Sequence, residues 1–224
     1  MSSRFTAVVF DLDGTLVDSA PDMAAALNAA LQEVGLAPFS LAEATSFVGS
    51  GALILVRRAL AARGATHLEE EDLRQRFIDI YESKLDGETA SYPGVEDMLA
   101  CLAAAKLPLG LCTNKPEAPA RGVCAALGLD RYFTVIVGGD TLPVLKPDPA
   151  PLLHCCAALG VAPEQTLYVG DSETDYATAR AAGTPFAFVK GGYQSRPIPD
   201  FAPDFLLEGP HLVGDLLQTH ATPS

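Results

Sequence analysis

Two carboxylates, Asp11 and Asp13, stand two residues apart where a short apolar run ends, in the sequence Val-Val-Phe-Asp-Leu-Asp-Gly-Thr of residues 8–15. The apolar part predicts a buried strand, which Gly14 ends. A turn at that point can aim both carboxylates into a crevice at the carboxyl end of the strand. One carboxylate could then attack an electrophile while the other moves a proton or helps to hold a metal ion. On this segment alone, a capped turn after Asp13 is an equally good interpretation.

Two further segments could bind a phosphate group. Thr113-Asn114-Lys115 follows a second apolar run, and its hydroxyl, its amide and the start of a helix suit phosphate oxygens. Thr113 could instead cap the helix that follows. Lys146 stands before a helix, and the prolines that follow it restrict the backbone. A fixed ammonium could pair with a phosphate or with a carboxylate nucleophile, although a solvated lysine is the more common use of such a sequence.

A fourth segment, residues 168–175, again ends an apolar run in acids. Asp171 falls at the tip of the predicted strand, so together with Asp11 and Asp13 it would supply hard oxygen ligands for magnesium. Asp175 falls at the start of the next helix, where carboxylates are favoured for structural reasons alone. The segment therefore predicts a metal site at the carboxyl ends of the strands.

The elements that must position these residues alternate along the chain. Apolar runs predict strands at 8–10, 107–113, 135–137, 167–169 and 186–189, with a weaker sixth at 205–207. Helical patterns lie between them, near 95–105, 116–127, 149–159 and 173–182. Strands that alternate with helices indicate an α/β fold with a Rossmann-like, doubly wound parallel sheet.

Residues 19–86 break this alternation and show only helical patterns. One helix runs to about Val34, and others lie near 41–47, 51–63 and 68–85. Ser19 resembles a helix cap, with a carboxylate, Asp22, three positions later as in a capping box. We therefore expect a core domain of residues 1–17 plus 90–224, and a helical domain of residues 18–89 inserted after the first strand.

Composition limits the classes of function. The 224 residues carry a net charge of −13, and 49% of them are apolar. The charge argues against nucleic acid or an anionic membrane surface as a partner, but a metal ion could still let a small anion bind. No run is long enough to span a membrane, no signal sequence is evident, and the five cysteines lack a metal-ligand spacing. We expect a cytoplasmic monomer or homodimer.

The order of the four segments, and their places at strand ends, resemble the haloacid dehalogenase superfamily of phosphohydrolases. The resemblance covers about residues 6–215, and it matches the helical insert to the small cap domain of that superfamily. Within it, the chain is most similar to the bacterial phosphoglycolate phosphatases. The segments that carry this similarity are 10–22, 47–52, 92–95, 113–116, 137–140 and 191–193. Ser50 departs from that group, which more often has a larger polar residue there.

The resemblance implies a magnesium-dependent phosphomonoester hydrolase that acts through an aspartyl-phosphate, with 2-phosphoglycolate as the favoured substrate. Asp11 would attack phosphorus, and Asp13 would protonate the leaving alcohol and then activate water. A carboxylate oxygen of Asp11, the backbone carbonyl of Asp13 and the side chain of Asp171 would hold Mg²⁺. These assignments predict that the first and fourth segments meet at one metal ion.

The resemblance also implies the groups that bind the substrate. Thr113, the amide of Asn114 and Lys146 would bind the phosphoryl oxygens, and Asp175 would orient Lys146 or a metal-bound water. A carboxylate on the substrate would need a cation from the cap. Arg57 and Arg58 are the candidates, and Arg58 is the better match, although either arginine could equally lie on a solvated helix face. The remaining expected contacts to phosphate or substrate are Leu12, Gly14, Thr15, Lys115, Gly49 and Ser50.

Other functions share the same core motifs. A phosphatase of sugar phosphates, or a mutase like β-phosphoglucomutase, would differ only in the cap. A phospho-accepting signalling module like a receiver domain also combines aspartates, a hydroxyl and a lysine around magnesium. Asp13 argues against the signalling module, because an acid placed to activate water would shorten the life of a phosphoprotein.

Overall fold

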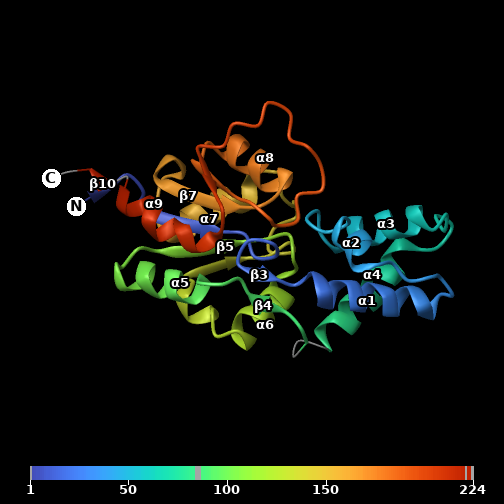
Figure 1. Ribbon diagram of the computed structural model, residues 1–224. Helices are drawn as coiled ribbons and strands as arrows, with labels where there is room; N and C mark the ends of the chain where they lie inside the picture. The colour runs from blue at the N-terminus through green and yellow to red at the C-terminus, as the bar shows by residue number, and fades with distance from the viewer. Residues whose placement is uncertain (1, 84–86, 220, 223–224) are drawn as a thin grey trace.

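A six-stranded parallel sheet forms the centre of the structure, a computed structural model that describes residues 2–83, 87–219 and 221–222 (Figure 1). The strand order is β6-β5-β2-β7-β8-β9, and every neighbouring pair is parallel. The strands are β2 (Ala7–Phe10), β5 (Leu109–Cys112), β6 (Val135–Val137), β7 (Thr166–Gly170), β8 (Phe186–Val189) and β9 (Phe205–Leu207). The predicted Rossmann-like α/β fold and its six strands are confirmed, with bounds that shift by no more than two residues.

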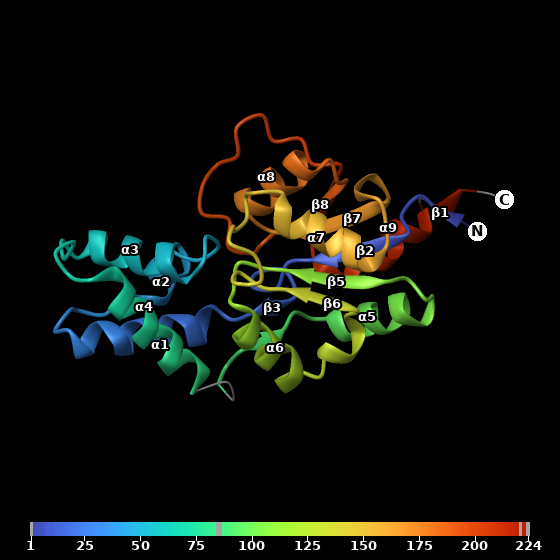
Figure 2. The same cartoon turned by 180° about the vertical axis from the view of Figure 1, so that it is seen from behind.

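Helices cover both faces of this sheet (Figures 1 and 2). Helices α7 and α8 lie on one face, and α5, α6 and α9 lie on the other. Side chains of a strand alternate between faces, so Val8 and Phe10 join one apolar cluster and Val9 joins the other. These helices are α5 (Val95–Ala104), α6 (Glu117–Ala126), α7 (Ala150–Leu159), α8 (Glu173–Ala182) and α9 (Val213–Thr219), with single turns at η1 (Asp130–Tyr132), η2 (Pro163–Gln165) and η3 (Pro210–Leu212).

Four helices within residues 20–82 pack together beside the sheet (Figure 1). They are α1 (Ala20–Glu33), α2 (Leu41–Thr45), α3 (Ala52–Ala62) and α4 (Glu70–Glu82). Helix α1 packs against α2 and α4, and α3 packs against α4. The four predicted helices are therefore present, while residues 84 and 85 of the last one lie outside the described residues. Across the described part of the chain, no helix has both the length and the apolar character to cross a membrane.

A short antiparallel ribbon joins these helices to the sheet. It consists of β3 (Val17–Asp18) and β4 (Ala90–Ser91), with Val17 opposite Ser91 and Asp18 opposite Ala90. Strands of two residues carry no periodic pattern, so the sequence does not predict them. A second such pair, β1 (Ser2–Ser3) with β10 (Ala221–Thr222), brings the two ends of the chain together.

The start of α1 differs from the prediction. Ser19 is the N-cap residue, but its side chain makes no cap hydrogen bond. Its hydroxyl instead donates to Oδ1 of Asp13 at 2.5 Å. Asp22 accepts hydrogen bonds from the backbone N–H groups of Glu88 and Thr89. The predicted capping box is therefore wrong, because both side chains bind groups that the fold brings from elsewhere.

Candidate active site

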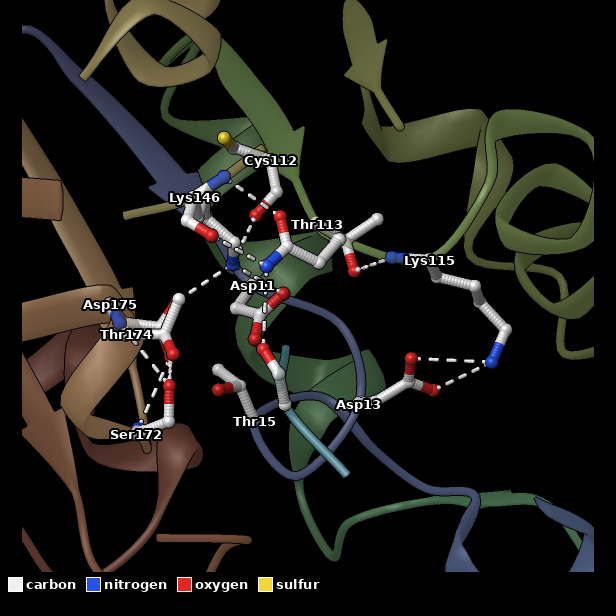
Figure 3. A network of polar contacts seen from close by, with 12 residues as sticks. Asp11, Asp13, Thr15, Cys112, Thr113, Lys115, Lys146, Ser172, Thr174 and Asp175 are labelled. Carbon is white, nitrogen blue, oxygen red and sulfur yellow. Dashed lines mark hydrogen bonds and ion pairs between the residues drawn. The ribbon is translucent and has the colours of Figure 1, made fainter. Parts of the chain in front are cut away.

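The carboxyl ends of three neighbouring strands bring the predicted residues together (Figure 3). Asp11 follows β2, Thr113 follows β5 and Asp171 follows β7, and β2 lies between the other two strands. The next strands along the chain, β5 and β6, lie on one side of β2, and the later strands β7, β8 and β9 lie on the other. A crevice forms outside the strand ends at such a switch point.

The loop after β2 is closed by its own backbone. The carbonyl of Leu12 accepts the N–H groups of Thr15 and Val17, and the N–H of Gly14 donates to Val17. Gly14 has a φ of +84°, and a Cβ atom there would lie 2.4 Å from Oδ2 of Asp171. Glycine is therefore required both for the backbone angle and for the close approach of Asp171. Leu12 itself is fully buried and does not line the cavity, so its side chain is not available to a substrate.

Lys146 is a fixed ammonium beneath Asp11. Its Nζ lies 3.0 Å from Oδ1 of Asp11 and 2.7 Å from Oδ1 of Asp175. The ammonium donates to the carbonyl of Cys112 at 3.0 Å, to the hydroxyl of Tyr168 at 2.9 Å and to Asp175. These three bonds use all the donors of an ammonium. Asp11 Oδ1 is therefore ion-paired but receives no hydrogen bond from the described residues.

Asp175 holds Lys146 in place. The backbone N–H of Ser172 donates to its Oδ2 at 3.1 Å, within a capping box that starts α8. The hydroxyl of Tyr168 donates to its Oδ1 at 2.7 Å. Burial opposes ionisation, but the Lys146 ammonium and these hydrogen bonds hold the pKa of Asp175 below its usual value. The sequence predicts that Asp175 orients either Lys146 or a metal-bound water, and the structure places Lys146 against it.

The second segment also braces Lys146. The side-chain amide of Asn114 donates to the carbonyl of Lys146 at 2.9 Å, and its Oδ1 accepts the N–H of Lys146 at 2.9 Å. Thr113 is buried beside them, and its Oγ1 accepts the N–H of Lys115 at 3.2 Å. Helix α6 has Pro116 as its N-cap residue. Thr113 therefore does not cap the helix, and its predicted contact with phosphate stays a prediction.

Asp13 points to a different partner, Lys115, on the far side of the crevice from Asp175 (Figure 3). Lys115 Nζ lies 3.0 Å and 3.2 Å from the two oxygens of Asp13. Burial disfavours the charged form of Lys115, but Asp13 and Tyr81 together outweigh burial and raise the lysine pKa above its usual value. Asp13 is thus held by Lys115 and by Ser19, a contact that the sequence does not predict.

Asp171 is held on both sides. Its Oδ1 accepts the hydroxyl of Thr15 at 2.5 Å, and its Oδ2 accepts the N–H of Tyr193 at 2.6 Å. A Cβ atom on Gly192 would lie 2.3 Å from Oδ2 of Asp171. The Gly-Gly-Tyr segment at 191–193 therefore reaches the site, which its sequence alone does not indicate.

Tyr193 also reaches the ribbon that leads to the helical insert. Its hydroxyl donates to Oδ1 of Asp18 at 2.6 Å and accepts the N–H groups of Ser19 and Ala20 at 2.8 Å and 2.9 Å. The backbone of one residue thus holds Asp171 while its side chain holds the start of α1.

The charges of the site fit a divalent cation. Asp11, Asp171 and Asp175 each offer an oxygen, and the three atoms lie within 4.8 Å of one another. Burial and the Asp175 carboxylate, partly offset by the Lys146 ammonium, raise the pKa of Asp11 to about 7. Burial and the carboxylates of Asp175 and Asp11 raise the pKa of Asp171 well above its usual value. Because Lys146 engages Asp175, Asp11 and Asp171 are left as hard oxygen ligands of the kind that Mg²⁺ prefers.

Addition of Mg²⁺ is expected to raise the melting temperature more at pH 8 than at pH 5.5. The raised pKa values mean that the folded protein holds protons on these carboxylates more tightly than the unfolded chain does, so stability from this cluster falls as pH rises through about 7. A cation restores it at high pH, whereas protons compete with the cation at low pH. At 100 times the dissociation constant the gain is about 2.7 kcal/mol. Differential scanning fluorimetry measures it, and an equal shift in Asp171→Asn would contradict the assignment.

Replacement of Gly192 by alanine is expected to weaken Mg²⁺ binding about tenfold or more, because the added methyl group must displace the Asp171 carboxylate. Isothermal titration calorimetry measures the dissociation constant. Gly214 in α9 is a matched control, since a Cβ atom there meets no atom within 4 Å. Equal affinities of the two variants would show that Asp171 does not hold the cation.

The helical insert lines one side of the cavity above Asp11. Gly49 and Gly51 line it, together with apolar side chains of α1, α3 and α4. Arg58 does not line it, because its guanidinium donates to the carbonyl of Phe47 at 3.0 Å and to the hydroxyl of Ser50 at 3.1 Å. The structure therefore places Ser50 and Arg58 in support of the loop and does not bring Arg58 to the cavity.

Comparisons with known proteins agree on one family. A family model for haloacid dehalogenase-like hydrolases matches residues 8–189. The chain is 49% identical over 216 residues to a phosphoglycolate phosphatase of Cereibacter sphaeroides, covering 94% of this chain and 97% of that protein. It is 46% identical over 198 residues to a phosphoglycolate phosphatase of Rhodospirillum rubrum, covering 86% and 82%. A crystal structure of a predicted phosphoglycolate phosphatase from Haemophilus somnus is similar, with a TM-score of 0.89, 32% identity and coverage of 96% and 98%.

Proposed function

Because the chain belongs to the haloacid dehalogenase-like hydrolases, we propose that it is a magnesium-dependent phosphatase that hydrolyses 2-phosphoglycolate to glycolate and phosphate. Relatives that carry this activity in their names match nearly the whole chain. The observation that carries the chemistry is the pairing of each aspartate of the first motif with its own lysine, Asp11 with Lys146 and Asp13 with Lys115. Two carboxylates in different surroundings can serve as nucleophile and as acid–base.

In the first half-reaction a carboxylate oxygen of Asp11 attacks phosphorus, and the bond from phosphorus to the ester oxygen breaks. Asp13 gives its proton to that oxygen, so the alcohol leaves neutral. The fixed Lys146 ammonium lies beside Asp11, where it stabilises the negative charge of the phosphoryl group in the transition state. Thr113 and Asn114 bind the phosphoryl oxygens from the end of β5.

In the second half-reaction water hydrolyses the aspartyl-phosphate. Asp13, now a carboxylate, takes a proton from the water that attacks phosphorus, and the bond to Asp11 breaks. Lys115 and Ser19 hold the carboxyl group of Asp13 in position for both steps. Free phosphate leaves, and both aspartates return to their starting forms.

Mg²⁺, held by Asp11, Asp171 and the carbonyl of Asp13, would neutralise charge so that one anion can approach another. Thr15 and Tyr193 orient Asp171 for this role. Asp175 acts through Lys146, which it keeps charged and in place. Without Asp175, Lys146 would lose the partner that fixes it beside Asp11.

We assign residues 18–89 as the cap domain and residues 1–17 plus 90–224 as the core. Apolar side chains of this segment line the cavity, and a cap that closed over a bound substrate would exclude bulk water during the reaction. A signalling module like a receiver domain has no use for such a cap, and the family of this chain is one of hydrolases.

The test is phosphate release from 2-phosphoglycolate with and without Mg²⁺. Three alternative substrates are tested in parallel: glucose 6-phosphate, β-glucose 1-phosphate and N-acetylmuramic acid 6-phosphate. We expect a clear preference for 2-phosphoglycolate that depends on Mg²⁺. Preference for a sugar phosphate would overturn the substrate but keep the chemistry, and isomerised sugar without free phosphate would indicate a mutase.

A further inference from the structure

Tyr81 is a buried polar group without an explained role. It lies in the last turn of α4, is 5% exposed and lines the cavity above Asp11. Its hydroxyl has no hydrogen-bond partner in the part of the chain that the structure describes. Buried phenolic hydroxyls usually have a hydrogen-bond partner, so a ligand group in the cavity would supply the partner that the Tyr81 hydroxyl lacks.

Lys115 lies against the same ring. Its Nζ is 4.3 Å from the centre of the Tyr81 ring while it pairs with Asp13. An ammonium has three donors, and the two contacts with Asp13 use no more than two of them. A donor of Lys115 therefore remains for an anion beside Tyr81.

These two groups stand out from the rest of the cavity wall. Lys115 is the one cation among the described residues that line the cavity, and Tyr81 is the one hydroxyl that the helical insert contributes to them. The other side chains from the insert are apolar, among them Met23, Leu55 and Phe77. An anionic substrate group would be desolvated without compensation against those side chains, but not beside Lys115 and Tyr81.

The proposed reaction brings the substrate carboxylate to the same place. The leaving oxygen must lie next to Asp13, which protonates it. In 2-phosphoglycolate a single methylene group separates that oxygen from the carboxylate, so the carboxylate must lie close to the partners of Asp13. Lys115 is one of them, and Tyr81 lies next to Lys115.

From this juxtaposition we infer that Tyr81 and Lys115 form the site that recognises the substrate carboxylate, with the Tyr81 hydroxyl as the donor supplied by the cap. The inference depends on the proposed function. It assigns substrate selection to the end of α4 near the cap boundary, and the Arg58 guanidinium serves the loop at 47–50 instead.

The experiment compares two substrates that differ only in this group. One is 2-phosphoglycolate, and the other is 2-hydroxyethyl phosphate, which has an alcohol in place of the carboxylate. Tyr81→Phe removes the hydroxyl alone. We expect the ratio of the two kcat/KM values to fall about tenfold or more, mainly through the KM for 2-phosphoglycolate, because a hydrogen bond to a charged group is lost. Tyr176→Phe, in the core helix α8, is the control and should keep the wild-type ratio.

The outcomes separate the two proposals. A wild-type enzyme without preference for 2-phosphoglycolate would overturn the proposed substrate, and the inference with it. A preference that Tyr81→Phe retains would leave the substrate standing and overturn the inference. An equal loss on both substrates would also overturn it, because it would show that Tyr81 acts on Asp13 and not on the carboxylate. Melting temperatures of both variants establish that they are folded.

Discussion

Asp11→Asn is expected to lower phosphate release by about 10⁴-fold or more while the protein remains at least as stable as the wild type. The amide cannot attack phosphorus, and loss of a nucleophile has effects of this size. In the folded protein the carboxylate of Asp11 is buried and close to that of Asp175, which raises its pKa to about 7. Ionised Asp11 therefore costs stability at pH 8, and a neutral amide of the same shape removes that cost.

The measurement has two parts, a malachite-green assay of released phosphate and a melting curve at pH 8 without Mg²⁺. Asp97→Asn, at an exposed position of α5, is the matched control and should change neither value. Activity within tenfold of the wild type would exclude Asp11 as the nucleophile. A melting temperature several degrees below that of the wild type would instead attribute the loss of activity to unfolding.

Lys146→Met is expected to lower the free energy of unfolding by about 3–5 kcal/mol, besides removing most of the activity. The ammonium contacts Asp11 and Asp175 at 3.0 Å and 2.7 Å, and both carboxylates are buried. Without it each carboxylate must either stay in the interior without a counter-charge or take up a proton, and removing one partner of a buried ion pair has a cost of this size. Lys146 holds the pKa of Asp175 below its usual value against the effect of burial. In the variant burial raises this pKa, so Asp175 takes up a proton at pH 4. The variant should therefore lose less stability at pH 4 than at pH 8.

Urea unfolding at the two pH values measures this effect. Lys190→Met is a matched control, because its ion pair with Glu208 lies at the surface and is worth no more than about 1 kcal/mol. The double variant Lys146→Met with Asp175→Asn should regain part of the loss, since it removes one of the stranded charges. Equal midpoints for Lys146→Met and Lys190→Met would show that the buried pairs do not contribute to stability.

The sequence predicts the helices and strands, which have a periodic or continuous apolar pattern, and the reactive residues that directly follow the strands. Buried parallel strands appear as short apolar runs, and the reactive residues stand directly after those runs. Strand ends meet at one edge of a parallel sheet, so the meeting of Asp11, Thr113 and Asp171 follows from local patterns together with topology. The helices of the insert follow from their own periodicity in the same way.

The partners of these residues could not be predicted, because they depend on how loops turn in space. Ser19 has the local signature of a helix cap, yet its hydroxyl binds Asp13 once the loop after β2 folds back. The N–H of Tyr193 reaches Asp171 across 22 positions of sequence, and nothing periodic links the two. Arg58 follows a glycine loop in the sequence, but its guanidinium donates to the carbonyl of Phe47 in that loop and does not line the cavity.

The ribbon of β3 and β4 gives the chain a modular plan. The helical insert leaves the sheet at Asp18 and returns at Ala90, and these two residues are paired partners in the ribbon. A chain that turned directly from one to the other would make a tight β-hairpin, and the order of the six parallel strands would stay the same. Evolution or protein engineering could therefore exchange the insert as one cassette, with new groups in the place of Tyr81, while the reactive ends of the strands are inherited intact.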